Sequence, residues 1–163
     1  MNKIEFELPK GDSCLFCEII EGKRDKGIVE ETALTLTLVN NRQYEVGQVL
    51  VMPRRHAPTV FDLTDEEATA IMQAVRRVGK AIVEAYDDVD GMTLYQNNGV
   101  VSLQEVPHFH MHVVPRRKAN SNWGKGPPHI AVLEKKETQV QKCNVRITIE
   151  QEKEGAETIR KYL

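Results

Sequence analysis

Apolar residues recur every three or four positions between residues 64 and 85, the spacing that places side chains on one side of an α-helix. The segment begins with Thr64-Asp65-Glu66-Glu67, in which a threonine is followed three residues later by a glutamate. Such a pair forms a capping box, where each side chain accepts a hydrogen bond from a free amide at the helix start. We therefore predict one long amphipathic helix over 64–85.

Four further segments have the composition of β-strands. They are rich in aliphatic and β-branched residues, and Gly, Pro or Asn bounds each of them at one end or both. The four segments are residues 34–39, 47–52, 92–96 and 108–115. The order strand, strand, long helix, strand, strand predicts the α+β class with an antiparallel sheet.

Beyond the last of these strands the composition changes. Residues 120–128 are rich in Gly, Pro and Asn, which indicates a loop. Short strands are predicted at 129–133 and 144–149, and a polar helix is predicted at 150–162.

A chain of 163 residues is long enough to bury one hydrophobic core, and two cores would be crowded. Residues 1–12 are polar and contain Gly and Pro, so we expect a flexible N-terminal arm. We assign residues 13–117 to one domain and residues 118–163 to a C-terminal extension of that domain.

The overall charge excludes some classes of partner. Net charge is −2 and 28% of residues are charged, so there is no basic excess of the kind that binds nucleic-acid polymers. No apolar run approaches membrane-span length, and the polar start Met1-Asn2-Lys3 lacks the apolar core of a signal peptide. The three cysteines are an odd number and do not suggest a disulfide framework, so we expect a cytoplasmic protein.

The strand predicted at 108–115 carries most of the chemistry. His108, His110 and His112 alternate with apolar residues. In a β-strand this spacing would place the three imidazoles on one face and the apolar residues between them on the other. A purely structural role would require a hydrogen-bonding partner for each buried imidazole, because burying an unpaired polar group is costly.

Two kinds of chemistry fit three such histidines. Histidines two apart on a strand can share a catalytic zinc ion that activates water. Alternatively, a neutral imidazole nitrogen can attack phosphorus and form a covalent intermediate. The residues around the strand favour the second reading, because Asn97 and Gln104 offer neutral donors for phosphate oxygens and no acidic residue lies between the histidines.

The run Gln104-x-Val106-x-His108-x-His110-x-His112-Val113-Val114 resembles the signature of the histidine-triad (HIT) superfamily of nucleotide hydrolases and transferases. Other blocks resemble the same family and occur in the same order. They are residues 14–22, 50–56, 63–67 and 97–99. The resemblance covers residues 13–117 and identifies them as a HIT domain, whereas residues 118–163 show none.

The resemblance implies a fold and a mechanism. The fold is a five-stranded antiparallel sheet with one long helix, which pairs through that helix and a strand into a two-fold homodimer. His110 matches the nucleophile that attacks the α-phosphate of a purine nucleotide derivative and becomes nucleotidylated, and His112 matches the residue that assists the leaving group. Gln104 and Asn97 match amides that hold the phosphoryl group, and Asn40 matches a ribose contact. The substrate would be a dinucleoside polyphosphate or a nucleoside phosphoramidate.

The resemblance also suggests a metal site. By itself Cys14-x-x-Cys17 is a weak signal, since it supplies only half of a tetrahedral set and also fits two buried thiols or a redox pair. Family members with this pair complete the set with the histidines that match His56 and His108. This would give a structural Zn²⁺ site and leave His110 free for chemistry. Without zinc, His56 and His108 would act as hydrogen-bonding groups.

Two positions depart from the family pattern. Gln48 stands where many members have histidine, so the contact made by that histidine is in question. Glu105 stands where several members have Ser or Thr near the leaving group, although its main-chain amide can still contact the substrate. A carboxylate there should repel a polyphosphate leaving group and favour a cationic amine.

Two other functions stay open on the sequence. A zinc-dependent hydrolase would use the triad histidines as catalytic metal ligands. A nucleotide-binding regulatory protein would keep the pocket without turnover.

Overall fold

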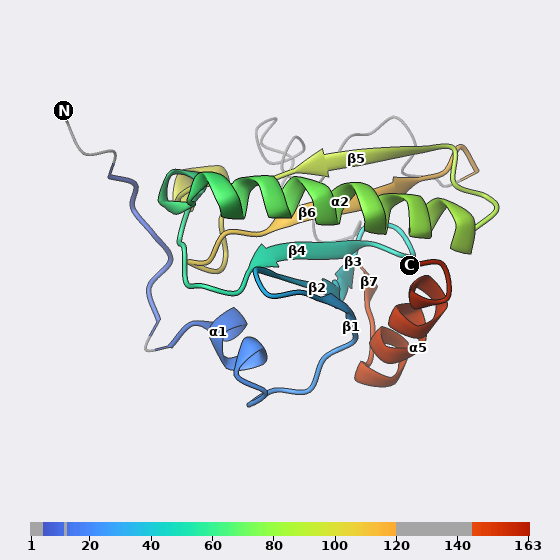
Figure 1. The fold of residues 1–163 in the computed structure, drawn as a ribbon, viewed down its shortest axis with the longest axis horizontal. Coiled ribbons are helices and arrows are strands. Elements are labelled where there is room, and N and C mark those ends of the chain that lie inside the picture. The colour runs from blue at the N-terminus through green and yellow to red at the C-terminus, as the bar shows by residue number, and fades with distance from the viewer. Residues whose placement is uncertain (1–4, 12, 120–144) are drawn as a thin grey trace.

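The computed structural model describes residues 5–11, 13–119 and 145–163. A five-stranded antiparallel sheet with strand order β1-β2-β4-β6-β5 runs through the molecule (Figure 1). Its strands are β1 (Ile28–Glu31), β2 (Thr35–Val39), β4 (Val49–Pro53), β6 (Met111–Arg116) and β5 (Gly91–Tyr95). This confirms the predicted α+β class. The short strand β1 has no counterpart among the predicted segments, since four residues carry little periodicity.

Helix α2 (Asp65–Ala85) lies across one face of the sheet (Figure 1). Its capping box forms as predicted: the Thr64 hydroxyl accepts from the Glu67 amide at 3.1 Å, and the Glu67 carboxylate accepts from the Thr64 amide at 2.9 Å. Valines of the central strands pack under the helix. They are Val39, Val49, Val51 and Val113, and they meet Ile71, Val75, Val78 and Ile82 of the helix.

The opposite face of the sheet carries a second, smaller core. Even-numbered residues of β2 and β4 point to it, because neighbouring strand residues face opposite sides. Leu36, Leu38, Leu50 and Met52 pack there with Phe16 and Ile19. Phe16 and Ile19 belong to the helix α1 (Leu15–Ile20), which is too short to show helical periodicity in the sequence.

The strand that carries the triad begins later than predicted. Pairing of β6 with β4 ends at Val51↔Met111, so only His112 of the three histidines lies in the strand. Continuing the register would place Phe109 opposite Pro53, which has no amide hydrogen to donate. The Phe109 amide donates instead to the Ala57 carbonyl at 2.6 Å. The expectation of three imidazoles in one regular strand was therefore wrong for His108 and His110.

The C-terminal residues join the same body as the domain. Strand β7 (Val145–Arg146) pairs with β3 (Arg42–Gln43), and α5 (Ile149–Arg160) packs against β1 and α2 (Figure 1). The helix predicted near the C-terminus is confirmed, and it starts at a Thr148 cap that cuts the predicted strand 144–149 short. The loop predicted at 120–128 and the strand predicted at 129–133 lie outside the described residues.

Two short 3₁₀ helices, η1 (Val60–Asp62) and η2 (Val100–Ser102), complete the described elements. The described part of the N-terminal arm touches both of them: Phe6 contacts the ring of Phe61, and the Glu7 carbonyl accepts from the Val100 amide at 2.9 Å. Among the described helices, none has both the length and the apolar character needed to cross a membrane.

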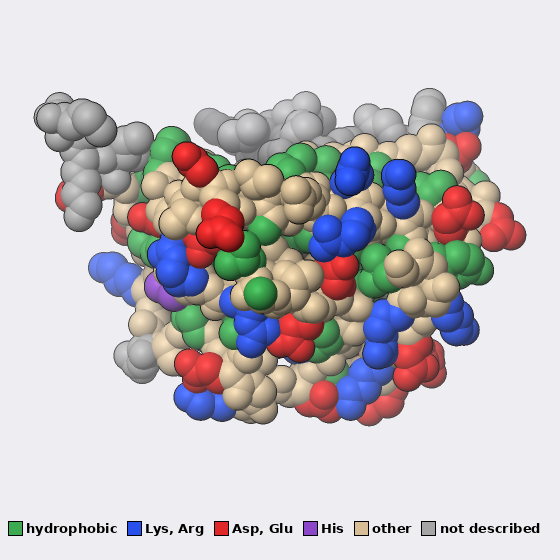
Figure 2. Space-filling model, viewed as in Figure 1, with side chains coloured by type: hydrophobic (Ala, Val, Ile, Leu, Met, Phe, Trp, Pro, Cys, Tyr) green, Lys and Arg blue, Asp and Glu red, His purple; other side chains and the backbone are tan. Residues whose placement is uncertain are grey.

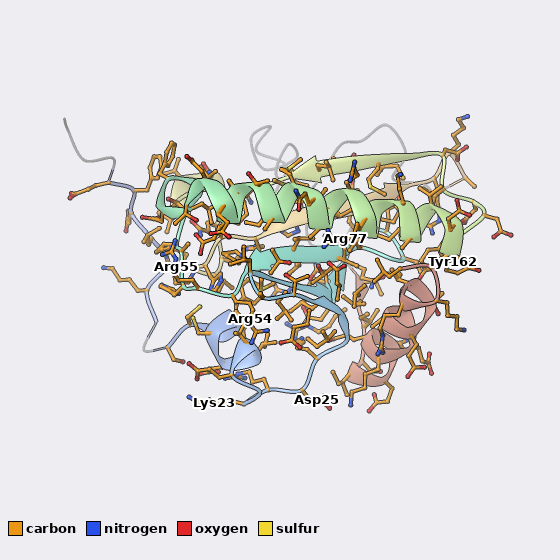
Figure 3. The ribbon with its side chains drawn as sticks, in the orientation of Figure 1. Lys23, Asp25, Arg54, Arg55, Arg77 and Tyr162 are labelled. Carbon is orange, nitrogen blue, oxygen red and sulfur yellow. The ribbon has the colours of Figure 1, made fainter. Side chains whose placement is uncertain are left out.

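Ion pairs on the surface tie helices to the sheet. Arg77 of α2 makes a two-pronged pair with Glu30 of β1, and Arg55 makes one with the capping residue Glu67 (Figure 3). Acidic and basic side chains are interspersed over the face shown in Figure 2. That face therefore has no extended patch of one charge.

Candidate functional site

A cavity of about 300 Å³ opens on the sheet face that carries α1. This volume is at the lower end of the range for small-molecule sites. One wall is apolar and is formed by Leu15, Phe16, Ile19, Leu38 and Leu50. The polar lining includes Asn40, Asn97, Glu105, His110 and His112, and the cationic lining is Lys26, Arg42 and Arg146. The cavity therefore combines an apolar slot with a polar, mainly cationic end.

The sheet register orders the floor of this cavity. His112 lies opposite Leu50, and Leu50 lies opposite Leu38. These three side chains share one face and follow one another across three strands, a span of about 10 Å. His112 and the leucines of the apolar wall are thus laid out along a single row.

His110 presents one free nitrogen. The residue is 9% exposed, and its Nδ1 lies 2.7 Å from the His108 carbonyl. Because a carbonyl oxygen only accepts, Nδ1 carries the hydrogen and Nε2 keeps its lone pair. Burial lowers the pKa of His110 below the ordinary histidine value. The imidazole is therefore neutral at pH 7 and has a nucleophilic nitrogen available.

His112 has the opposite tautomer. The Tyr44 amide donates to Gln48 Oε1 at 2.7 Å, which identifies Oε1 as the acceptor and Nε2 as the donor of that side chain. Gln48 Nε2 lies 3.2 Å from His112 Nδ1, so Nδ1 accepts and Nε2 carries the hydrogen. The ring of Tyr95 stacks on His112 at 4.2 Å.

The two neighbouring imidazoles are therefore complementary. Their ring centroids are 5.0 Å apart, and one offers a lone pair where the other offers a hydrogen. Such a pair can attack an electrophile and protonate the group that leaves it. Burial raises the pKa of Tyr95 to about 12, so the stacked phenol stays protonated beside them.

The structure brings most of the predicted substrate-binding residues to the cavity. Asn40, Asn97 and Glu105 line it together with both histidines. The Asn40 carboxamide oxygen accepts from the Arg42 amide at 3.1 Å, and the Asn97 carboxamide donates to the Leu103 carbonyl at 3.4 Å. Their roles toward a substrate stay predictions.

Gln104 does not line the cavity. Its Oε1 accepts from the Gly99 amide at 2.7 Å, and its Nε2 donates to the carbonyls of Pro58 and Val106 at 2.7 and 2.9 Å. Both amide hydrogens are therefore used within the chain. The side chain is 4% exposed and fastens the loop before the triad, so it has no hydrogen left for a phosphoryl group.

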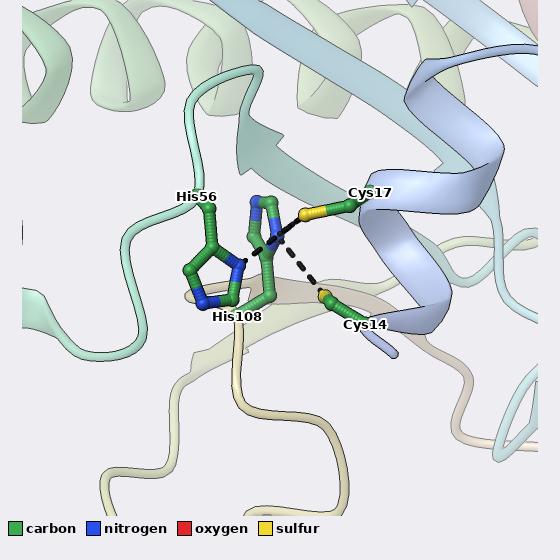
Figure 4. Close-up of side chains that lie close together, drawn as sticks. All are labelled: Cys14, Cys17, His56 and His108. Atoms are coloured by element: carbon green, nitrogen blue, oxygen red, sulfur yellow. Dashed lines mark hydrogen bonds between the residues drawn. The ribbon is translucent and has the colours of Figure 1, made fainter. Parts of the chain in front are cut away.

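Two cysteines and two histidines lie close together (Figure 4). They are Cys14, Cys17, His56 and His108, and their ligand atoms all lie within 4.8 Å of one another. Cys14 Sγ is 3.5 Å from His108 Nδ1, and Cys17 Sγ is 3.3 Å from His56 Nδ1 and 3.6 Å from His108 Nδ1. A tetrahedron around a metal with bonds of about 2.2 Å has edges of about 3.6 Å. The spacing therefore fits a tetrahedral metal site.

The protonation of His108 also fits a metal ligand. Its Nε2 lies 2.9 Å from the Pro53 carbonyl and must donate, which leaves the Nδ1 lone pair pointing at the sulfurs. Burial lowers the pKa of His108 to about 4, and burial raises the pKa of the Cys17 thiol to about 11. A metal would therefore meet a neutral imidazole but would have to displace the thiol proton.

Helix α1 belongs to both sites. Cys17 lies within it and Cys14 is its N-cap, while Leu15 and Phe16 line the cavity. The ring of Phe16 contacts His110 edge-on at 5.0 Å. A metal held by the cysteines would thus fix the apolar wall of the cavity against the histidines.

Several lining residues were not assigned to the site from the sequence. Lys26, Arg42 and Arg146 are surface-type residues in short segments, and they reach the cavity only because β3 pairs with β7 and α5 packs on β1. Tyr95 is the last residue of a predicted strand, and its stacking on His112 follows from the pairing of β5 with β6.

Comparisons with known proteins identify the family of this chain. The HIT domain family model matches residues 21–119. The adenosine 5'-monophosphoramidase hnt1 of Schizosaccharomyces pombe is 35% identical over 114 residues, 70% of this chain and 80% of that protein. The bis(5'-adenosyl)-triphosphatase of Dictyostelium discoideum is 38% identical over 95 residues, 58% of this chain and 63% of that protein.

The fold also matches solved structures. A Zn-bound histidine triad family protein from Mycobacterium smegmatis has a TM-score of 0.71 and 24% identity, with 92% of each chain covered. It shares the fold of this chain.

The cysteine and histidine group gives a direct test. Titration of the metal-free protein with Co²⁺ should produce one equivalent of tetrahedral, thiolate-ligated cobalt, seen as sulfur-to-cobalt charge-transfer absorption. Affinity should rise with pH, because binding releases the Cys17 proton. Cys17→Ser should weaken binding at least tenfold, whereas the control His110→Ala should bind as wild type. Equal binding by both variants would contradict the assignment.

Proposed function

The chain belongs to the HIT domain family, and on that premise we propose that it is a nucleotide hydrolase or transferase. The substrate is a purine nucleotide derivative, cleaved at the bond between the α-phosphorus and the leaving group. The observation that carries this proposal is the pair of opposite tautomers on His110 and His112 inside one cavity. Relatives named as a phosphoramidase and a triphosphatase support the substrate class. The preference for a purine rests on the family alone.

The reaction follows from the two imidazoles. His110 Nε2 attacks the α-phosphorus, and a nitrogen–phosphorus bond forms while the bond to the leaving group breaks. The leaving group takes the electron pair of that bond and the hydrogen from His112 Nε2. Water then attacks the phosphorus, returns a proton to His112, and releases the nucleoside monophosphate and free His110. Main-chain amides and the Asn97 carboxamide would donate hydrogen bonds to the phosphoryl oxygens and stabilise the charge that develops on them.

We propose Zn²⁺ as the metal of the Cys14, Cys17, His56 and His108 group. Two thiolates and two imidazoles are a typical structural zinc set, and such a closed site leaves no position for a reactive water. When bound, the ion supplies cross-linking of α1 to the triad segment. The chain's own residues keep the chemistry, since His110 turns its Nδ1 to the His108 carbonyl and lies outside the group. This arrangement argues against a catalytic zinc shared by the triad.

The covalent step has a specific test. Wild-type protein mixed with adenosine phosphoramidate or diadenosine tetraphosphate and quenched in base should carry adenylate mass on the peptide containing His110. His110→Ala should lose the adduct and about 10³-fold or more of the turnover, as expected when a nucleophile is removed. It should still bind AMP, which serves as the folding control.

Other outcomes would support the two alternative functions. Turnover without an adduct, lost on chelation and equally lost in His108→Ala, would indicate a catalytic zinc. Tight AMP binding with neither turnover nor adduct would indicate a regulatory nucleotide-binding protein.

The buried state of His110 predicts a pH profile. Its pKa is lowered from 6.5 by burial, so the nucleophile stays unprotonated to lower pH than an exposed histidine. The acid limb of kcat/KM, which reports the free enzyme, should therefore have its midpoint below pH 6.5. Phe16→Ala exposes the ring of His110 to water and should move that midpoint upward. A wild-type midpoint above 6.5 that Phe16→Ala leaves unchanged would contradict this argument.

We further propose the two-fold homodimer, formed through α2 and the edge strand β5. Met72 and Val83 of α2 and Leu94 of β5 are 51%, 48% and 44% exposed, although large apolar side chains usually pack. Sedimentation velocity should show a dimer for the wild type and a monomer for Leu94→Lys. The control Val46→Lys changes an exposed valine of the turn between β3 and β4 and should stay dimeric. A monomeric wild type at micromolar concentration would contradict the proposal.

A further inference from the structure

Two arginines lie opposite each other at the edge of the cavity. Arg42 of β3 and Arg146 of β7 are direct cross-strand partners, and both line the cavity. Like charges in this position repel each other and destabilise the pair of strands. An arrangement of this kind becomes favourable when an anion lies between the two guanidinium groups.

Glu105, the acidic residue of the cavity lining, already forms an ion pair. Arg42 Nη1 donates to both carboxylate oxygens of Glu105, at 3.2 and 3.0 Å. This ion pair offsets the charge by which Glu105 would repel an anionic leaving group. Lys26, the third cation of the lining, is paired with Glu152 at 3.0 Å.

Arg146 is the exception among the cations of the lining. It is exposed, and within the described residues no hydrogen bond or ion pair of its guanidinium is seen. Among the three cations of the lining, Lys26 and Arg42 have described ion-pair partners, and the charge of Arg146 is therefore in excess. That excess favours an anion beside Arg42 and Arg146.

We propose that Arg42 and Arg146 form an anion subsite for the leaving group, which makes a nucleoside or dinucleoside polyphosphate the substrate class. This inference rests on the proposed function, because the subsite is defined relative to the α-phosphate that His110 attacks. Guanidinium groups bind phosphate oxygens in a two-pronged geometry that an ammonium group does not reproduce. The C-terminal segment, through Arg146, thereby takes part in substrate choice.

The subsite fits the chemistry of that substrate class. When His110 Nε2 bonds to the α-phosphorus, the bond from that phosphorus to the bridging oxygen breaks, and the electron pair stays on the departing β-phosphate. His112 supplies a proton to this oxygen, and the guanidinium groups offset the charge of the remaining phosphates. A phosphoramidate leaves as an amine and gains nothing from the two arginines.

Binding in the absence of turnover tests the subsite by itself. In a His110→Ala background, calorimetric titrations with AMP and with ATP, without divalent cations, measure what the extra phosphates add. ATP should bind at least tenfold more tightly than AMP, and added salt should reduce the difference. Arg146→Gln should remove most of this difference, and Arg42→Gln should do the same. Arg160→Gln, which removes an exposed arginine of α5 outside the cavity, is the matched control and should leave the difference between ATP and AMP unchanged.

Turnover then tests the substrate class. In the protein with His110 intact, Arg146→Gln should lower kcat/KM for diadenosine tetraphosphate about tenfold, roughly the value of one charge-assisted hydrogen bond. The kcat/KM for adenosine phosphoramidate should stay within twofold of wild type. The Tm of Arg146→Gln should stay at or above that of wild type, because a repulsive pair has been removed. Arg146→Lys should recover only part of the loss.

The outcomes separate the two proposals. Equal affinity for AMP and ATP, or equal losses on both substrates, would overturn the subsite even if His110 forms the adduct. Tighter ATP binding that depends on both arginines, in a protein that forms no adduct, would support the subsite and overturn the proposed reaction.

Discussion

A neutral imidazole carries a single hydrogen, so the partner of one ring nitrogen determines what the other can do. The three histidines of this site are each assigned a role in this way. The Pro53 carbonyl accepts a hydrogen bond from His108 Nε2, which leaves the Nδ1 lone pair directed at the cysteines. The His108 carbonyl accepts from His110 Nδ1, which leaves the lone pair on Nε2. Gln48 donates to His112 Nδ1, so the hydrogen of His112 is on Nε2. Metal ligand, nucleophile and acid thus follow from three hydrogen bonds along one short segment.

These hydrogen bonds depend on where the sheet stops. Because the pairing of β4 with β6 ends at Met111, the residues before it are free of the ladder. The carbonyl of Pro53 can then accept from His108, and the carbonyl of His108 can accept from His110. A strand that continued regularly through His108 would have placed three similar imidazoles side by side. The irregular start is what allows each of them a different partner.

The sequence was sufficient for the frame and for part of the site. The capping box at Thr64 and the spacing of apolar residues predicted α2 almost to its ends, since both are local properties. The Cys14, Cys17, His56 and His108 group also follows from a recognisable pattern. Gln104 shows the limit of such a pattern. Its side chain is saturated by Gly99, Pro58 and Val106, and only the folded loop reveals that.

Charge at the cavity could not be read from the sequence for the same reason. Glu105 alone suggests an environment hostile to a polyphosphate, but its effect depends on a guanidinium 63 residues away in the chain. Arg146 comes from the C-terminal segment and reaches the cavity because β7 pairs with β3, a long-range pairing that no local propensity predicts. The HIT domain supplies the reacting histidines and Arg42, and Arg146, which lies outside that domain, adds charge at the same end of the cavity. Catalysis and substrate choice can therefore vary independently, because the hydrogen bonds that set the tautomers do not involve the arginines.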